Sequence, residues 1–348
     1  MYNKYLIIMA KDSLVEVNKQ GAFVRSDSLF RDVVSAEHPL FKPEPNRYHL
    51  YVAMACPWAN RCLTILHLKG LNDIIGVSIV HSTWQKTKLE DPNDDHKGWT
   101  FVQDPSINFK SSSGYGCFNT DGCTNDKING FRTVRDIYEQ NGFNGPKFTV
   151  PILYDTATNK IVNNESSEII RILNFAFNEW STKKDLDLYP NHLQQQIDDI
   201  NNWIYHDINN GVYKAGFAQS QEAYDDACEK LYNALDKVED ILSKKRYLIG
   251  DQLTEADIRL FMTLVRFDEV YVVYFKCNMK QIKEYDNIQN YCREIYQIPE
   301  VTNTINMDHI KMHYFTSHPV LNPYSIIPKG PSSINNFLLP HNRGNLGK

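Results

Sequence analysis

The sequence predicts an α/β domain followed by an all-helical domain. Residues 47–80 have the pattern strand, helix, strand, which is typical of a βαβ unit with two parallel strands. After residue 190 nearly all of the chain has the pattern of helices. A chain of 348 residues is also longer than one core usually supports. These observations together predict two domains.

The first domain is predicted from its order of elements. An irregular arm over 1–46 precedes a strand over 47–54, a helix over 61–69 that Gly70 ends, and a strand over 74–80. A helix over 130–140, strands over 147–154 and 160–162, and a helix from 163 follow. Helix, strand, strand, helix after a βαβ unit is the thioredoxin-like order, and we place this domain at 47–176.

The second domain is predicted from helical stretches, the clearest being 192–209, 221–243 and 256–275. We expect a linker over 177–190, an all-α domain over 191–316 and an irregular C-terminal tail over 317–348. Thr254 and Asp257 have the spacing of a capping box at the start of a helix.

A long polar loop is predicted over 85–130, within the first domain. Loops of this length are usually functional or disordered, and we expect the part over 104–127 to be mobile. Cys117 and Cys123 lie in it, six residues apart, which matches no common zinc pattern. The sequence assigns this loop no role.

The composition is that of a globular protein, with 42% hydrophobic and 23% charged residues and a net charge of −5. No long basic run is present, so nucleic acid is not an expected partner. No stretch reaches 18 apolar residues, and the apolar run over 5–10 is short for a signal peptide. Seven scattered cysteines suggest reduced thiols and a cytoplasmic protein.

Cys56 is the leading candidate for catalysis. It lies on the turn between the first strand and the first helix, where free backbone N–H groups and the helix dipole stabilise a thiolate. Pro57 suits the first helical position. A thiol in such a place can fall from a pKa of about 8.5 to roughly 3.5–7.5. The alternative is a small buried side chain. Position 59 is alanine, so the resolving thiol must come from outside, and glutathione is the abundant candidate.

Several motifs in this order resemble those of the glutathione transferases, and specifically the Xi class, the glutathionyl-hydroquinone reductases. They are Cys56-Pro57-Trp58-Ala59, Gly98-Trp99-Thr100-Phe101, Thr149-Val150-Pro151, Asn164-Glu165-Ser166, and the stretches 210–218, 253–259 and 313–315. The resemblance runs from about residue 21 to 331. It implies the glutathione transferase architecture, a thioredoxin-like domain followed by an all-α domain.

The resemblance also implies a glutathione site. Cys56 would be the nucleophile and Trp99 would pack on glutathione. Val150 would present its backbone before a cis-proline at Pro151, and Glu165 and Ser166 would hold the γ-glutamyl end. A helix N-terminus suits a carboxylate, although Glu165 and Ser166 also fit plain helix capping.

An aromatic acceptor site is implied at Tyr213, Tyr271 and Tyr314, with Tyr213 and Tyr314 in catalytic roles. A phenol can hydrogen-bond a hydroquinone hydroxyl and help to move its proton. Taken singly, each of these residues also fits simple packing.

Two positions depart from the family pattern. Asn60 stands where the family usually has histidine. Lys147 stands where the family usually has an arginine that contacts glutathione. A lysine offers a single ammonium group in place of the bidentate guanidinium of arginine.

We therefore expect an enzyme that reduces glutathionyl-hydroquinones through a Cys56–glutathione disulfide, with glutathione as co-substrate. The expected partners are glutathione, its hydroquinone conjugates and a second copy of the chain in a homodimer, with no membrane. No metal is expected, since His309 and His313 have helical spacing but no acidic partner. The alternatives are an omega-like thioltransferase or dehydroascorbate reductase, and a non-enzymatic binding module with this fold.

Overall fold

The computed structural model describes residues 16–18 and 20–346, and the apolar run over 5–10 lies outside them. The chain divides into two compact units. The thioredoxin-like unit comprises Ser28–Pro190 and Tyr296–Lys329. The helical unit comprises Asn191–Ile295 with the described parts of Met1–Asp27 and Gly330–Lys348.

The core of the thioredoxin-like unit is a four-stranded sheet in the order β4-β3-β7-β8. Its strands are β3 (Tyr48–Val52), β4 (Gly76–Ile79), β7 (Ile152–Asp155) and β8 (Lys160–Asn163). β3 pairs in parallel with β4 and antiparallel with β7, and β7 pairs antiparallel with β8. This topology confirms the predicted thioredoxin-like fold. β7 begins only after Pro151, because proline has no N–H to give to the ladder.

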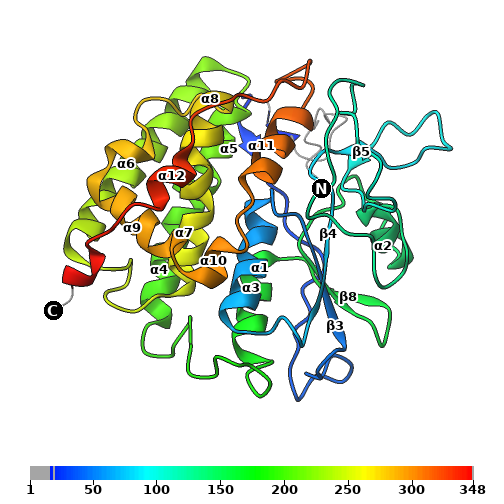
Figure 1. Cartoon of the computed structure of the whole chain (residues 1–348), viewed down its shortest axis with the longest axis horizontal. Helices are drawn as coiled ribbons and strands as arrows, with labels where there is room; N and C mark the ends of the chain where they lie inside the picture. Colours follow the sequence, from blue (N-terminus) through cyan, green and yellow to red (C-terminus); the bar gives the residue numbers. More distant parts are fainter. Residues whose placement is uncertain (1–15, 19, 347–348) are drawn as a thin grey trace, which may run out of the picture. The chain divides into compact units, whose positions relative to one another are not determined.

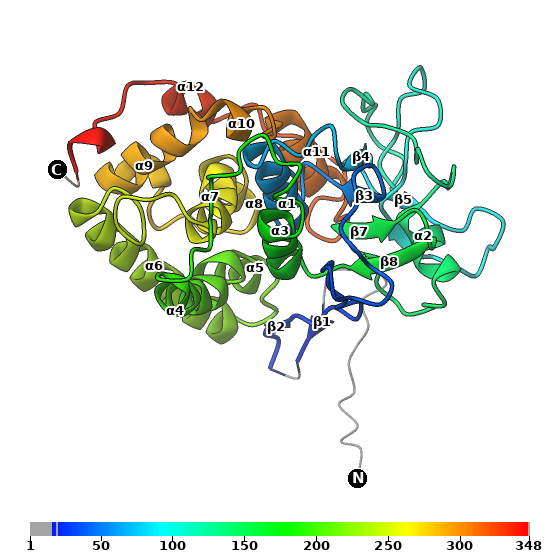
Figure 2. The same cartoon turned by 90° about the horizontal axis from the view of Figure 1, so that it is seen from below.

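Helices cover both sides of this sheet. Figure 2 shows α1 (Pro57–Leu68) and α3 (Ser166–Phe175) on one side and α2 (Val134–Gln140) on the other. α1 is followed by Gly70 with φ +61°, the left-handed conformation expected of a helix-ending glycine. At its other end α1 begins shortly after β3 ends, and the candidate nucleophile Cys56 lies between these two elements.

Residues 296–329 lie in this unit, although the sequence analysis expects them in the helical domain and the tail. They contain α10 (Pro299–Thr302) and α11 (Met307–Thr316). Asn60 Nδ2 donates to the carbonyl of Thr304 at 2.8 Å, and the Thr64 and Thr304 hydroxyls lie 2.7 Å apart. These buried polar contacts attach the segment to α1.

The long loop contains the short strands β5 (Gln85–Lys86) and β6 (Lys97–Gly98), which pair antiparallel. The mobility expected of residues 104–127 stays a prediction, and the end of this stretch makes hydrogen bonds to the sheet. The Thr124 amide donates to the carbonyl of Ile79 at 2.8 Å, and the Asp126 carboxylate accepts from the Tyr51 hydroxyl at 2.9 Å. These bonds join the loop to the strands of the sheet.

The helical unit is labelled in Figure 1, and its elements agree broadly with the predicted helices. They are β1 (Glu16–Val17), β2 (Phe23–Val24), α4 (Gln194–Ile204), η1 (Tyr205–Asn209), α5 (Gly211–Gly216), α6 (Gln221–Lys244), α7 (Glu255–Arg266), η2 (Phe267–Tyr271), α8 (Val272–Tyr274), η3 (Ile282–Glu284), α9 (Asp286–Tyr296), α12 (Ser333–Phe337) and η4 (Arg343–Asn345). Two predicted helices run on into π-helical segments, η1 and η2. The capping box of Thr254 and Asp257 is present at the start of α7.

The tail is not wholly irregular, since α12 and η4 lie in it. Arg293 donates to the carbonyl of Asn336 at 3.1 Å, and Arg343 donates to the carbonyl of Leu242 at 2.7 Å. These long-range bonds were not predictable from the local sequence.

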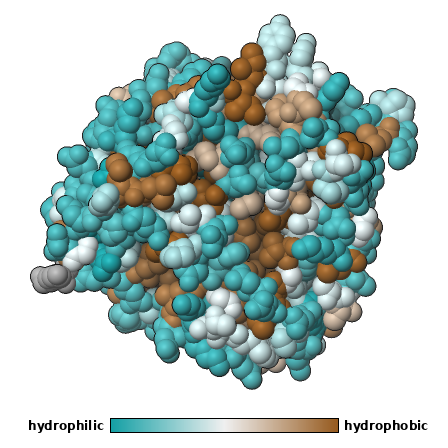
Figure 3. All heavy atoms as spheres, in the orientation of Figure 1, coloured by the Kyte–Doolittle hydropathy of each residue, from teal (hydrophilic) through white to brown (hydrophobic). Residues whose placement is uncertain are grey.

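Hydrophilic residues cover most of the face shown in Figure 3, with smaller hydrophobic patches between them. Within the described part of the chain, no helix combines the length and the apolar character needed to cross a membrane.

Candidate active site

Cys56 is the N-cap residue of α1, with Pro57 directly after it at the first helical position. Its backbone is extended, with φ −75° and ψ 119°. As the N-cap residue, Cys56 lies at the positive end of the helix dipole. The side chain is partly exposed. These features are those predicted for a reactive thiol, and they place Cys56 where a thiolate is stabilised.

Val150 lies opposite this cysteine. The Cys56 thiol donates to the carbonyl oxygen of Val150 across 3.7 Å. The peptide bond between Val150 and Pro151 is cis, as the resemblance implies. The backbone of Val150 therefore lies beside the sulfur, where a peptide-like ligand of the thiol would run.

Glu165 and Ser166 lie at the N-terminus of α3, with Glu165 as the N-cap. The Glu165 carboxylate accepts from the amide and hydroxyl of Ser167, at 3.0 and 2.8 Å, and from the Ser28 hydroxyl at 3.1 Å. Burial alone would raise the pKa of Glu165. The guanidinium of Arg61 and these hydrogen bonds outweigh it, and the pKa lies below its ordinary value. An anion at this position suits an ammonium group, and it also caps the helix.

Trp99 follows β6 and is 6% exposed. Its ring stacks on His313, with the centroids 4.5 Å apart, and meets the edge of Trp84 at 5.6 Å. The indole is thus one member of a buried aromatic cluster. Its contact with glutathione stays a prediction.

The two departures from the family pattern differ in their surroundings. Asn60 is fully buried and its amide donates to Thr304, so it joins α1 to the 296–329 segment. Lys147 is partly exposed and precedes the Thr149–Val150 backbone. A role of Lys147 toward glutathione stays a prediction.

The structure brings two of the three predicted tyrosines together. Tyr213 on α5 and Tyr271 on η2 have ring centroids 6.2 Å apart, and both contact Phe275. Both are buried. Tyr314 lies on α11 in the thioredoxin-like unit, next to His313 and His318. An acceptor site made of all three therefore stays a prediction.

Tyr138, which no sequence motif singles out, connects the predicted site residues. The buried hydroxyl of Tyr138 donates to the carbonyl of Thr149 at 3.0 Å and accepts from Asn164 at 2.9 Å. It links the Thr149–Val150 segment beside Cys56 to the turn that carries Glu165. No local signal marks this tyrosine, because its partners are 11 and 26 residues away.

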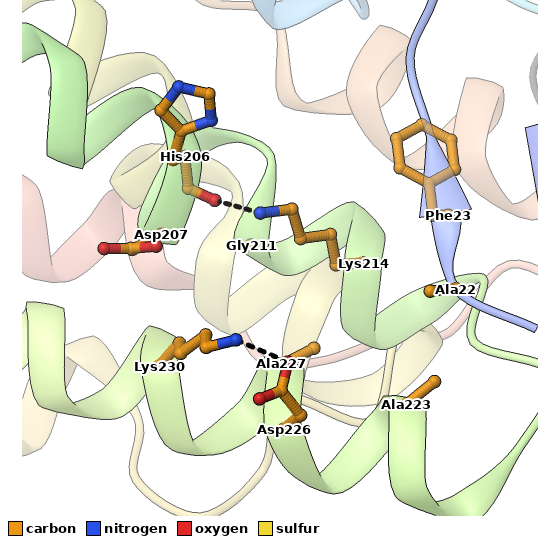
Figure 4. Close-up of a pocket in the computed structure, with 10 residues that line it drawn as sticks. All are labelled: Ala22, Phe23, His206, Asp207, Gly211, Lys214, Ala223, Asp226, Ala227 and Lys230. Atoms are coloured by element: carbon orange, nitrogen blue, oxygen red, sulfur yellow. Dashed lines mark hydrogen bonds and ion pairs between the residues drawn. The ribbon is translucent and has the colours of Figure 1, made fainter. Parts of the chain in front are cut away.

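A pocket of about 170 Å³ lies in the helical unit, and none of the predicted site residues lines it. Figure 4 shows Phe23 among the residues that line the pocket, together with Lys214 and Lys230, each of which is paired with a neighbouring residue. Lys214 Nζ donates to the carbonyl of His206 at 2.8 Å, and Lys230 lies 2.7 Å from Asp226. Both lysine ammonium groups that line the pocket are therefore engaged by neighbouring residues.

No group of three or more His, Cys, Asp or Glu side chains among the described residues is arranged to hold a metal ion. His309 instead contacts the carbonyl of Asp121 at 2.6 Å through its Nε2.

Comparison with known proteins agrees with this geometry. Residues 55–175 match the model of the glutathione S-transferase N-terminal domain, and residues 221–294 match that of the C-terminal domain. The chain is 45% identical to the glutathionyl-hydroquinone reductase YqjG of Escherichia coli, with 89% of each chain covered. It is 42% identical to the glutathione S-transferase omega-like 2 of Saccharomyces cerevisiae, covering 89% of this chain and 95% of that one.

Solved structures agree as well. A glutathione S-transferase Xi from Phanerochaete chrysosporium has a TM-score of 0.80 at 44% identity, covering 92% of this chain and all of that one. The glutathione-bound structure of YqjG has a TM-score of 0.80 at 43% identity, covering 91% and 96%. The chain therefore belongs to the glutathione transferase family. Within that family its similarity is to the Xi class, as the motifs predicted.

Proposed function

We propose that the protein is a glutathione-dependent enzyme that reduces glutathionyl-hydroquinones to hydroquinones. The observation that carries the proposal is the position of Cys56. Its sulfur lies at the N-terminus of α1, 3.7 Å from the carbonyl of Val150 next to a cis-proline. The similarity to a glutathionyl-hydroquinone reductase supports the same conclusion.

In the first step the Cys56 thiolate attacks the sulfur of the glutathionyl-hydroquinone. A disulfide forms between Cys56 and glutathione, and the bond between sulfur and the aromatic carbon breaks. The ring carbon keeps the electron pair and takes a proton. We assign the donation of this proton to Tyr213 or Tyr314, whose hydroxyls are the predicted acids of the acceptor site.

In the second step the thiolate of another glutathione attacks the mixed disulfide. Oxidised glutathione leaves and the Cys56 thiolate is restored. Two glutathione sulfurs are oxidised to a disulfide while the ring carbon is reduced, so the electrons balance without another cofactor. We assign Trp99, Lys147, Val150, Glu165 and Ser166 to glutathione, and Tyr213, Tyr271 and Tyr314 to the ring.

The test is turnover of a glutathionyl-hydroquinone with glutathione, following hydroquinone and oxidised glutathione together. We expect equal amounts of both, and none from the Cys56→Ser variant. Cys62→Ala is the matched control, because Cys62 is a buried thiol six residues further along α1 whose pKa is raised by burial. Retained turnover in Cys56→Ser would exclude the mechanism.

An omega-like thioltransferase or dehydroascorbate reductase is the second candidate, since it would use the same cysteine and a relative carries an omega-like name. Such an enzyme needs no tyrosines that recognise a ring. Tyr314→Phe separates the two. A dedicated ring site predicts lost activity on the hydroquinone conjugate alone, whereas equal loss on a mixed glutathione disulfide would favour the second candidate.

We also infer that the protein acts as a homodimer in the cytoplasm. None of the seven cysteines, all of which lie in the described part of the chain, forms a disulfide, and this suits a reducing compartment. Sedimentation equilibrium of the purified chain, of 40.4 kDa, tests the dimer. A mass of one chain at micromolar concentration would contradict it.

A further inference from the structure

Arg61 is a buried arginine on α1 that contacts Ser166 of the predicted γ-glutamyl site. It is 1% exposed, although arginine is mostly found at the surface. Its Nη2 donates to the Ser166 hydroxyl at 2.5 Å and lies 3.7 Å from a carboxylate oxygen of Glu165. Its Nε is buried with no hydrogen-bond partner within the described residues. The central carbon of the guanidinium also lies over the Trp58 ring, 5.0 Å from the ring centroid.

Stability of the fold does not explain this arginine well. A buried cation is costly unless it is fully paired, and Glu165 lies beyond hydrogen-bond distance of it. The positive ends of α1 and α3 are close by, and helix N-termini disfavour cations. An apolar side chain would join α1 to α3 without these penalties. The residues that Arg61 contacts give a better reason for its presence.

The contact with Ser166 has a chemical consequence. A guanidinium has donors and no acceptor, so Ser166 Oγ must accept in this hydrogen bond. The hydroxyl proton of Ser166 is then directed away from Arg61 and is free to be donated to a ligand. A carboxylate, which only accepts, is the ligand group that such a donor suits.

The contact with Glu165 has the opposite consequence. The positive charge of Arg61 favours the ionised carboxylate, which only accepts hydrogen bonds. One guanidinium thus makes Ser166 a donor and keeps Glu165 an anion, on adjacent residues. An α-amino acid end, with a carboxylate and an ammonium on one carbon, is complementary to this pair.

We infer that Arg61 is a positioning residue of the γ-glutamyl subsite. It makes Ser166 a hydrogen-bond donor and keeps Glu165 an anion, and the subsite thereby selects ligands that carry a free α-amino acid end. The inference rests on the proposed function, because it assumes that glutathione binds at Glu165 and Ser166. Arg61 itself touches no reacting atom. It acts through Ser166 on the ligand carboxylate and through Glu165 on the ligand ammonium.

The test compares three ligands by titration calorimetry on the full chain. They are glutathione, 4-aminobutanoyl-Cys-Gly, which lacks the α-carboxylate, and glutaryl-Cys-Gly, which lacks the α-ammonium. We expect the wild type to bind glutathione at least about tenfold more tightly than either analogue, since each analogue leaves one charge-assisted contact unmade. Arg61→Gln should weaken glutathione binding about tenfold or more and reduce both preferences.

The variants are chosen to separate a subsite role from a structural one. Arg61→Lys keeps the positive charge but lacks the bidentate guanidinium, so it should retain part of the preference for glutathione over the two analogues. In the double variant Arg61→Gln with Ser166→Ala, the preference for ligands with the α-carboxylate should fall no further than in the single variant that loses more of it. Arg31→Gln is the matched control, because Arg31 is an exposed arginine that contacts Glu168, further along α3.

The outcomes are distinguishable. A wild type that binds no glutathione would overturn both the proposed function and this inference. Equal weakening of all three ligands in Arg61→Gln and Arg61→Lys, with the preferences kept, would overturn the inference alone and leave Arg61 a structural residue. In Arg61→Gln the KM for glutathione should rise by a larger factor than the kcat falls, because the γ-glutamyl end of glutathione takes no part in the sulfur chemistry. A kcat loss without a KM rise would also contradict the inference.

Discussion

The imidazole of His313 lies stacked on the indole of Trp99, with the ring centroids 4.5 Å apart and the planes at 29°. Its Nδ1 lies 2.9 Å from the carbonyl oxygen of Ser82, which can only accept, so this nitrogen carries a proton. The Ser317 hydroxyl lies 3.1 Å from the same nitrogen. His313, which fitted an ordinary helix position, therefore packs against the ring of Trp99, a residue predicted to contact glutathione.

We expect His313→Ala to lower the free energy of unfolding by about 2–3 kcal/mol, through the cavity and the lost ring contacts. It should also raise the KM for glutathione several-fold, because Trp99 loses its support. Denaturant unfolding and steady-state kinetics measure the two effects. His192→Ala, at an exposed position, is the control and should change neither. An unchanged KM in a destabilised His313→Ala would mean that Trp99 does not contact glutathione.

Cys56 should be alkylated first among the cysteines. Burial raises the pKa of the Cys62, Cys228, Cys277 and Cys292 thiols and raises that of Cys123 to about 12. An unperturbed thiol is only about 1% ionised at pH 6.5. We expect iodoacetamide at this pH to modify Cys56 at least about ten times faster than any other cysteine.

Peptide mass mapping over time measures this, and saturating glutathione should slow the modification of Cys56 alone. The Cys117→Ala variant removes the exposed thiol and provides a simpler background. Faster labelling of Cys117 than of Cys56 in the wild type would argue against an activated thiolate at the helix N-terminus.

Acid should destabilise the thioredoxin-like unit in part through His49. This residue of β3 is buried, with Nε2 2.9 Å from the Ser78 hydroxyl, and burial lowers its pKa to about 4. Between pH 6.5 and 4 the unfolded chain binds a proton that the folded chain does not. Stability present above pH 6.5 is therefore lost as the pH falls through this window, by about 2 kcal/mol per such histidine between pH 7 and 5.

His49→Gln removes the titration while keeping an amide that can contact Ser78. The loss of unfolding free energy from pH 7 to pH 5 should be about 2 kcal/mol smaller in this variant than in the wild type. Urea unfolding at both pH values measures it, with His192→Gln as the exposed control. Identical pH dependence of wild type and His49→Gln would show that His49 is not held neutral.

The N-terminal arm should matter for the aromatic substrate. Phe23 stacks on Tyr213 with centroids 6.2 Å apart, and the Arg25 guanidinium lies 5.3 Å from the centre of the Tyr213 ring. Arg25 is itself oriented by Asn210, at 3.0 Å. We expect Phe23→Ala to destabilise the helical unit by about 3 kcal/mol and to free the Tyr213 ring.

If Tyr213 contacts the substrate ring, Phe23→Ala should raise the KM for a glutathionyl-hydroquinone about three- to tenfold, with less effect on a small mixed glutathione disulfide. Val24→Ala, at a 45% exposed position of the same strand, is the matched control. Equal KM changes on both substrates would separate the arm from ring recognition.

Much of the fold and the candidate site could be predicted because the signals were local. Cys56 and Pro57 are adjacent in the chain, and a strand before them and a helix after them are enough to place the thiol at a helix N-terminus. Gly70, the capping box of Thr254 and the start of β7 after Pro151 are also decided by a few neighbouring residues. These features follow from backbone chemistry, which a sequence displays directly.

Only the tertiary structure decided which distant groups meet. The bond from Arg61 to Ser166 spans 105 residues, and the contact of His313 with Ser82 spans 231. Asn60 attaches residues 296–329 to the thioredoxin-like unit across 244 residues, against the expected domain limits. A sequence shows which groups can donate or accept, but a buried polar group finds its partner through packing of the whole unit. The position of Cys56 at a helix N-terminus was therefore predictable from the sequence, whereas the contacts between distant residues around it were not.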